Sequence, residues 1–221
     1  MLRSDFMGKH EVITVSKGVL NMLSLLDDQG NDCSWLNKPE NWTLHNKELS
    51  MTTQPKTDFW RKTFYGFDQM NGHAIYKELL GAFETEVTLT MKDPSERYDQ
   101  AGVMILISDD CWMKVSLEYV PEKYSYLGSV VTNSGFSDWS SKNVPTPEGE
   151  ISLSFKVTRA GGDYRVWAKF AADEEYEQIR IMRLHDEPNG PVKLGLYACS
   201  PSSEGSFTTV FHTWTVQKEV K

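Results

Sequence analysis

The chain of 221 residues carries 31 acidic and 23 basic side chains, which gives it a formal net charge of −8. Because an acidic chain repels phosphate backbones and anionic lipids, we expect neither nucleic acid nor a membrane as a partner. At this length one large domain can bury enough surface to fold without disulfides or metal ions.

The first 32 residues differ from the rest of the chain. Residues 17–26 have the spacing of one short amphipathic helix, and the Asp-Asp-Gln-Gly stretch at 27–30 would close it. The start of the chain lacks the apolar run of a signal peptide, and no stretch is long enough to span a bilayer. We predict an N-terminal extension over residues 1–32, a β-domain over 33–221 and a cytoplasmic location.

The cysteines and histidines form no recognisable disulfide or metal-binding pattern. Cys33, Cys111 and Cys199 are far apart and odd in number, and the five histidines are scattered. They build neither a disulfide framework nor a CxxC zinc pair, and no glycine-rich phosphate loop is present. We therefore expect no metal and no cofactor, although the hard oxygens of Asp109 and Asp110, and of Asn133 with Asp138, leave calcium open.

Polar and aromatic residues are interleaved between residues 57 and 73. Asp58, Trp60 and His73 are the candidates for ligand contacts in this region. A histidine in a loop could serve as a general base, and it could equally be a structural residue with its hydrogen bonds satisfied.

Alternating apolar residues recur after residue 33 between clusters of Gly, Pro, Asn and Asp, which is typical of β-strands. Residues 151–157 and 163–170 alternate on either side of Gly161 and Gly162, and this pattern predicts a hairpin. Further strands are predicted over 83–91, 192–198 and 207–216. About a dozen strands in one domain indicate two stacked antiparallel sheets rather than a small barrel.

The most informative segment runs from residue 98 to residue 119, where a turn at 108–111 joins two predicted strands. In the second strand Met113, Val115, Leu117 and Tyr119 would face the core, and the opposite face would carry Trp112, Lys114, Ser116 and Glu118. An aromatic ring, a cation and a carboxylate in one row could form a ligand-binding platform. The same row could also be a solvated face with a weak Lys114–Glu118 surface pair.

A second polar cluster follows at residues 129–140, where residues 133–135 make a turn. Asn133, Asp138 and Trp139 are candidates here, because short polar side chains beside an indole are suited to a hydroxyl-rich ligand. Turn formation explains Asn133 equally well, but it does not explain the tryptophan.

Several short motifs occur in a fixed order along the chain: residues 35–39, 57–60, 65–67, 71–73, 98–102, 131–133 with 137–140, and 199–201. Together, over residues 33 to 217, they resemble the concanavalin A-like family of unknown function that includes the regulation-of-enolase proteins. The resemblance implies an all-β jelly-roll sandwich of two curved antiparallel sheets with a concave groove. It also implies a likeness to domains appended to glycosidases.

Three functions remain open from the sequence. The first is a non-catalytic binding or regulatory domain that holds a carbohydrate or sugar phosphate and acts by contacting another cytosolic protein. The second is a glycoside hydrolase or lyase in which Glu118 pairs with a second carboxylate. The candidates for that carboxylate are Asp99, Asp138 and Glu86. The third is a protein-interaction domain. The expected ligand-binding residues are Trp112, Lys114, Glu118, Asn133, Asp138, Trp139, Asp58, Trp60, His73 and Asp99.

Overall fold

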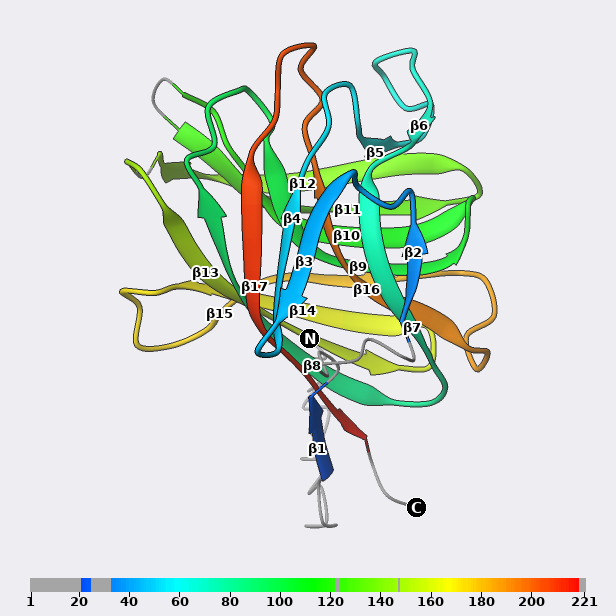
Figure 1. The fold of residues 1–221 in the computed structure, drawn as a ribbon. Coiled ribbons are helices and arrows are strands. Elements are labelled where there is room, and N and C mark those ends of the chain that lie inside the picture. Colours follow the sequence, from blue (N-terminus) through cyan, green and yellow to red (C-terminus); the bar gives the residue numbers. More distant parts are fainter. Residues whose placement is uncertain (1–20, 25–32, 122–123, 147, 219–221) are drawn as a thin grey trace, which may run out of the picture.

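The computed structural model describes residues 21–24, 33–121, 124–146 and 148–218. They form two large antiparallel sheets that pack face to face as a jelly-roll sandwich (Figure 1), which confirms the all-β fold expected from the sequence. Within these ranges no helix capable of crossing a membrane is found.

The first sheet has eight strands. In spatial order they are β15 (Glu177–Arg183), β14 (Asp163–Phe170), β13 (Ile151–Ala160), β8 (Phe83–Lys92), β17 (Thr208–Lys218), β4 (Glu48–Thr52) and β3 (Asn41–His45), with β1 (Asn21–Ser24) paired to the end of β17. The predicted hairpin is β13–β14, and Gly161 between them has a φ of 61°, a conformation that glycine adopts without strain.

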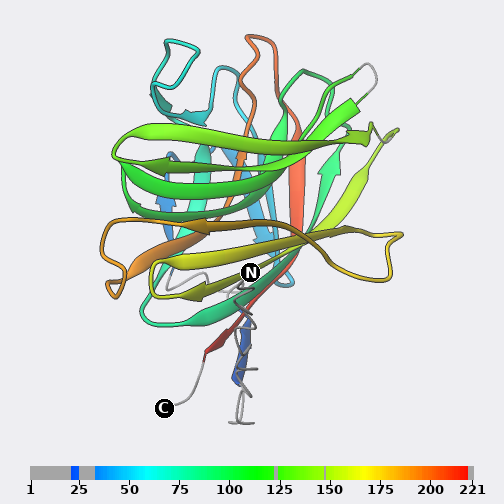
Figure 2. The same ribbon diagram turned by 180° about the vertical axis from the view of Figure 1, so that it is seen from behind.

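The second sheet has seven strands. In spatial order they are β12 (Phe136–Pro145), β11 (Tyr124–Asn133), β10 (Cys111–Glu118), β9 (Gln100–Ser108), β16 (Val192–Cys199), β7 (His73–Leu79) and β2 (Ser34–Leu36). Figure 2 shows β9 to β12 and β16 lying side by side. The turns predicted at 108–111 and 133–135 are present as the β9–β10 and β11–β12 connections.

The main core lies between the two sheets and follows the period of two along each strand. On β10, Met113, Val115 and Leu117 have no exposed surface and join one apolar cluster with Val87 and Phe155 of the other sheet. Full burial of each such side chain stabilises the fold by about 1.5–3 kcal/mol.

A smaller apolar cluster covers part of the outer face of the seven-stranded sheet. A short hairpin of β5 (Phe59–Trp60) and β6 (Gln69–Met70) lies over this face. The ring of Phe59 packs edge-on against Trp112 at 6.3 Å and against Tyr197 at 6.0 Å between centroids. The hairpin thus converts part of an open sheet face into a second core.

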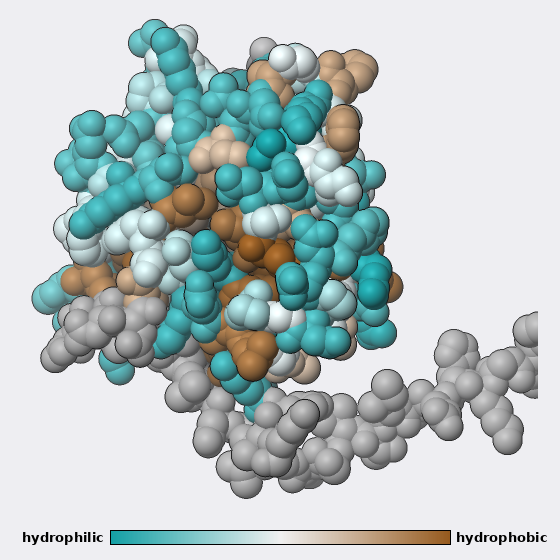
Figure 3. Space-filling model, turned by 90° about the vertical axis from the view of Figure 1, so that its right-hand side faces the viewer, coloured by the Kyte–Doolittle hydropathy of each residue, from teal (hydrophilic) through white to brown (hydrophobic). Residues whose placement is uncertain are grey.

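On the side seen in Figure 3 the surface is mostly hydrophilic, with hydrophobic residues gathered toward the middle.

The helix predicted over residues 17–26 is wrong where the structure describes it. Residues 21–24 form β1, in which Asn21 pairs with Lys218 and Ser24 pairs with Thr215. The physical reason is the geometry of β17, because β4 covers only its residues 208–211 and leaves the rest of that edge for another strand. The remainder of the predicted helix lies outside the described residues.

Candidate ligand-binding cavity

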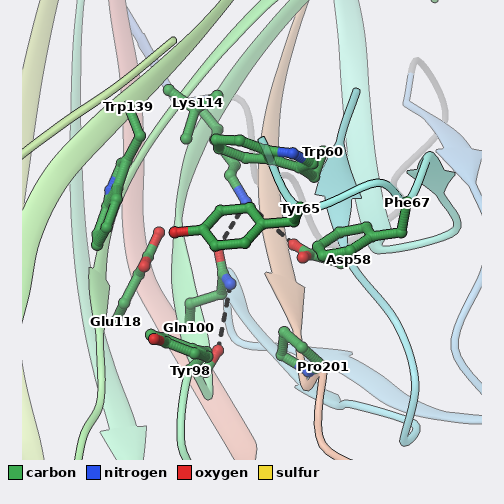
Figure 4. Close-up of a pocket in the computed structure, with 11 residues that line it drawn as sticks. Asp58, Trp60, Tyr65, Phe67, Tyr98, Gln100, Lys114, Glu118, Trp139 and Pro201 are labelled. Atoms are coloured by element: carbon green, nitrogen blue, oxygen red, sulfur yellow. Dashed lines mark hydrogen bonds and ion pairs between the residues drawn. The ribbon is translucent and has the colours of Figure 1, made fainter. Parts of the chain in front are cut away.

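A cavity of about 200 Å³ lies on the outer face of the seven-stranded sheet, beside the β5–β6 hairpin. Side chains from β5, β9, β10, β11 and β12 meet there with residues of the β5–β6 loop and of the connections before β5, before β9 and after β16 (Figure 4). The lining residues are Asp58, Trp60, Tyr65, Phe67, Tyr98, Gln100, Lys114, Glu118, Val130, Trp139 and Pro201.

Strand register explains why residues far apart in the sequence meet at the cavity. Lys114 on β10 lies opposite Val130 on β11, which in turn lies opposite Trp139 on β12. Glu118 lies opposite Gln100 on β9 and Tyr126 on β11. Because directly paired residues of an antiparallel sheet point to the same face, two parallel rows cross the cavity.

Aromatic rings form the walls of the cavity. The rings of Trp60 and Tyr65 pack edge-on at 5.3 Å, and Tyr65 stacks on Phe67 at 5.8 Å with an interplanar angle of 20°. On the opposite side, Trp139 packs against Tyr126 at 5.2 Å. The buried indole Nε1 of Trp139 has no hydrogen-bond partner within the structure described. The walls are therefore apolar, and one of them contains an unsatisfied donor.

The wall on the hairpin side is held by a tight loop over residues 61–68. Lys62, Phe64 and Gly66 all have positive φ, at 54°, 62° and 73°. The indole of Trp60 donates to the carbonyl of Thr63 at 2.9 Å, and the backbone N–H of Arg61 donates to the hydroxyl of Ser137 at 2.9 Å. These contacts anchor the loop to its own hairpin and to β12, and they place two aromatic rings over the cavity.

The floor of the cavity is a buried hydrogen-bonded network around Lys114, which is 2% exposed. Its Nζ donates to Oε1 of Gln100 at 2.9 Å and to Oδ1 of Asp58 at 3.2 Å. Gln100 also accepts a hydrogen bond from the hydroxyl of Tyr197 at 3.1 Å. Burial by itself lowers the pKa of Lys114, but the charges and hydrogen bond around it, with Asp58 first and Glu118 among them, together outweigh burial and raise this pKa, so the ammonium stays charged.

Glu118 is the exception in this network. It is 7% exposed, and none of the described residues donates a hydrogen bond to its carboxylate, which points into the cavity (Figure 4). Burial raises the pKa of Glu118 to about 7, although the charge of Lys114 opposes the shift, and the charge of Asp58 adds to it. Near neutral pH this carboxyl group therefore exists in both protonation states.

Five of the ten residues expected from the sequence line the cavity: Asp58, Trp60, Lys114, Glu118 and Trp139. Trp112 lies on the expected face but has no exposed surface, because the β5–β6 hairpin covers it. Its indole donates to the backbone carbonyl of Asp109 at 3.1 Å. The expectation that Trp112 lines an open groove is therefore wrong, and the residue belongs to the second core.

The other four expected residues lie outside the cavity, because they alternate onto the inner face or its rim. Asp138 neighbours Trp139 in β12 but points the other way and forms an ion pair with Arg180 at 2.6 Å. Asn133 accepts from the backbone N–H of His185 at 2.9 Å, and Asp99 accepts from the hydroxyl of Ser200 at 2.6 Å.

His73 is a structural residue in this arrangement. Its Nδ1 is 2.6 Å from the carbonyl oxygen of Asn37, and its Nε2 accepts from the backbone N–H of Gln54 at 3.2 Å. Burial lowers the pKa of His73, while the hydrogen bond to Asn37 opposes the shift, so the ring is neutral near pH 7. Both ring nitrogens are hydrogen-bonded, so neither is available to act as a general base.

Several cavity residues were not expected from the sequence: Tyr65, Phe67, Tyr98, Gln100, Val130 and Pro201. A signal existed for Gln100 and Tyr98, because they alternate with the core residues of β9 and therefore share the outer face. No pattern in the sequence indicated that the loop carrying Tyr65 and Phe67 would fold over that face. Within the described ranges, no group of three or more His, Cys, Asp or Glu side chains could hold a metal ion.

Sequence comparisons relate the chain to known proteins. Residues 35–219 match the family described as "Protein of unknown function (DUF1349)". The chain is 33% identical over 184 residues to Regulation of enolase protein 1 from Saccharomyces cerevisiae (strain ATCC 204508 / S288c). The alignment covers 83% of this chain and 88% of that protein.

Structural comparisons give the same fold. A crystal structure of a functionally unknown protein from Saccharomyces cerevisiae has a TM-score of 0.75 at 29% identity, covering 86% of this chain and 98% of that one. A xylan beta-1,4-xylosidase from Bacillus halodurans C-125 has a TM-score of 0.61 at 13% identity, covering 85% of this chain but only 39% of the enzyme. At that identity the likeness to the enzyme concerns the fold alone.

Proposed function

The chain belongs to the DUF1349 family of proteins of unknown function, and we propose that within it the chain is a non-catalytic binding domain of the cytosol. Its ligand is a small carbohydrate or sugar-derived molecule held in the cavity beside the β5–β6 hairpin. Cys111 and Cys199 are buried free thiols, which is consistent with a reducing compartment.

The observation that carries this proposal is the pairing of aromatic walls with a buried polar floor. Trp60, Tyr65 and Trp139 offer flat apolar surfaces, while Lys114 and Glu118 lie buried between them. Small-molecule sites combine mostly apolar walls with a few convergent polar groups that fix orientation. A sugar ring presents apolar C–H faces and a polar rim of hydroxyl groups, so it matches both surfaces at once.

The size of the cavity limits the ligand to one ring. Its volume of about 200 Å³ is below the range of roughly 300–1,000 Å³ that is usual for drug-sized ligands. We therefore propose a single sugar unit, or the end of a longer chain, as the occupant.

A regulatory output through a protein partner fits the name of the yeast relative, Regulation of enolase protein 1. The loop beside the cavity offers an aromatic ring that such a partner could contact, because Phe64 packs edge-on against the cavity residue Tyr65 at 5.2 Å and is 92% exposed. Exposed aromatic side chains of this kind are enriched at protein interfaces.

Hydrolysis of a glycoside is the second candidate, and the pKa of about 7 at Glu118 favours it because a general acid works best when its pKa is near the working pH. A second carboxylate is also needed. Glu86 accepts a hydrogen bond from Tyr176 in the other sheet, and Asp99 and Asp138 lie outside the cavity. Asp58 is the remaining acid at the cavity, and it is paired with Lys114.

The experiment is a thermal-shift screen of the purified protein against monosaccharides, oligosaccharides and sugar phosphates, repeated with Trp139→Ala. A ligand at 100 times its Kd adds roughly 2.7 kcal/mol of stability. The expected result is a shift that disappears in Trp139→Ala and persists in Trp167→Ala, a control on β14 of the other sheet.

Either of two outcomes contradicts the binding proposal. A flat response to every sugar would favour a domain that contacts only proteins. A response that survives in Trp139→Ala would place the ligand elsewhere. Turnover of a glycoside that is lost in Glu118→Gln would instead establish the hydrolase.

A further inference from the structure

The charges on the cavity floor do not balance. Lys114 is matched by Asp58 at 3.2 Å and by the amide oxygen of Gln100 at 2.9 Å. Glu118 is left over, since it is more than nine-tenths buried and receives no hydrogen bond from the described residues. A buried carboxylate without a donor is costly in free energy, so its presence indicates a partner supplied from outside.

The surroundings of Glu118 indicate the charge of that partner. Trp60, Tyr65, Tyr98 and Trp139 line the same cavity, and the faces of such rings carry negative electrostatic potential. Aromatic walls around a carboxylate attract an organic cation, because cation–π contacts and a charge-assisted hydrogen bond act together.

We infer that the cavity selects a ligand with a positively charged amine, and that this amine takes the carboxylate of Glu118 as its partner. The inference rests on the proposed function and sharpens it, because within the carbohydrate class it names amino sugars. The ammonium supplies the missing donors, and the ring of the sugar lies against the aromatic walls.

The same charges disfavour a sugar phosphate. Lys114 is the one cation among the residues that line the cavity, and it is already paired with Asp58. A phosphate group would have to enter beside two carboxylates without an uncommitted positive charge to receive it. Like charges brought together in a desolvated site repel strongly.

Binding of a cation is coupled to the proton on Glu118. Its pKa is about 7, so a cation that requires the ionised carboxylate releases up to one proton on binding. The titratable groups that face or couple to Glu118 are Lys114, Asp58, Tyr65, Tyr98, Tyr126, Tyr197 and Cys199. Burial raises the pKa of Tyr65, Tyr197 and Cys199, so these three stay neutral around pH 7.

The experiment compares matched ligands by isothermal titration calorimetry at pH 7: glucosamine, glucose and N-acetylglucosamine, and the corresponding galactose series. We expect the amino sugar to bind about tenfold more tightly than the neutral sugars of the same ring, the difference that one charge-assisted hydrogen bond provides. In Glu118→Gln, which keeps the shape of the side chain, this preference should fall to about twofold or less.

Two controls separate the local charge from other effects. Asp138→Asn removes a carboxylate of the same strand as Trp139 that lies outside the cavity, and it should leave the preference unchanged. Tetramethylammonium keeps its charge at every pH. Its affinity should rise about tenfold from pH 6 to pH 8 as Glu118 ionises, and should not change in Glu118→Gln.

The outcomes distinguish the two proposals. If neutral sugars bind as tightly as amino sugars, or if Glu118→Gln keeps the preference, the inference about the amine is overturned while sugar binding stands. Binding of tetramethylammonium without any sugar response would overturn the carbohydrate proposal and leave the cation site standing. If neither sugars nor tetramethylammonium bind, both are overturned.

Discussion

The two faces of the seven-stranded sheet are equally buried around β10, yet they differ in what satisfies the buried groups. On the inner face Met113, Val115 and Leu117 pack into an apolar core. On the outer face Lys114 and Glu118 are 2% and 7% exposed, although both side chains are ionisable. Burial therefore does not distinguish a structural face from a candidate binding face. The separation lies in whether each polar group has a partner within the protein.

Two buried carboxylates show the same contrast, one just before β9 and the other at the end of β10. Asp99 has no exposed surface and accepts hydrogen bonds from the hydroxyl of Ser200 and from the backbone N–H groups of Ser95 and Glu96. Burial raises the pKa of Asp99, and these hydrogen bonds oppose the shift. Glu118 is buried without such donors, so it is the group that a ligand would have to satisfy.

The largest expected effect comes from breaking the charge pair on the outer face. Lys114→Met leaves the carboxylate of Asp58 without its buried cation and should destabilise the protein by about 3–5 kcal/mol. Urea unfolding at pH 7 measures this loss, and the double variant with Asp58→Asn should recover a large part of it. A loss below about 1 kcal/mol would mean that the pair is not buried in solution.

A change on the inner face should be similar in size but independent of charge. Leu117→Ala removes a fully buried side chain and should lower the free energy of unfolding by about 2–5 kcal/mol. Because no titratable group is involved, denaturant unfolding at pH 5 and at pH 8 should give the same loss. A strong pH dependence would contradict the separation of the two faces.

Glu118→Gln should stabilise the protein, which is opposite in sign to the first two changes. The folded pKa of about 7 exceeds the ordinary value of 4.5, so the folded state holds its proton more tightly than the unfolded state. The proton on Glu118 stabilises the folded state fully below about pH 4.5, and this stabilisation is lost as the pH rises through about 7. The variant should thus gain nothing at pH 4 and up to about 3 kcal/mol at pH 8.

Chemical denaturation of both proteins across this pH range measures the gain. Asp138→Asn serves as the matched control, because that carboxylate lies outside the cavity, and its variant should show no comparable rise with pH. An equal gain at pH 4 and pH 8 would show that burial does not perturb Glu118.

The smallest effect is expected from the unsatisfied indole. Trp139→Phe keeps an aromatic ring in the wall and removes a buried N–H that has no partner within the described structure. Since no hydrogen bond is lost, thermal unfolding should show a change within about 1 kcal/mol. A larger loss would reveal that this N–H is satisfied in solution, for example by ordered water.

Alternation along β10 could be interpreted correctly from the sequence, and it placed Lys114 and Glu118 on one face and Leu117 on the other. The same rule could have excluded Asp138 as a partner of Trp139, because neighbouring residues in a strand point to opposite faces. It could likewise have excluded Asp99, which alternates with Gln100.

The pairing of Gln100 with Glu118 depends on an irregularity that the alternation does not reveal. The register shifts between Cys111 and Trp112, so that Trp112 pairs with Leu106 and Glu118 pairs with Gln100. Without the shift, Glu118 would lie opposite Ala101 and the outer row of β9 would be displaced. A bulge of this kind is set by the packing of both strands against their neighbours.

The sequence by itself determined the fold class, the two faces of each long strand and the polar row that contains Lys114 and Glu118. These follow from a period of two, which depends only on neighbouring residues. Only the tertiary structure decided that the β5–β6 hairpin buries Trp112, brings Tyr65 and Phe67 over the row and leaves Glu118 without a donor. The reason is that exposure and hydrogen bonding depend on what segments distant in the chain place over a strand, and no local period carries that information.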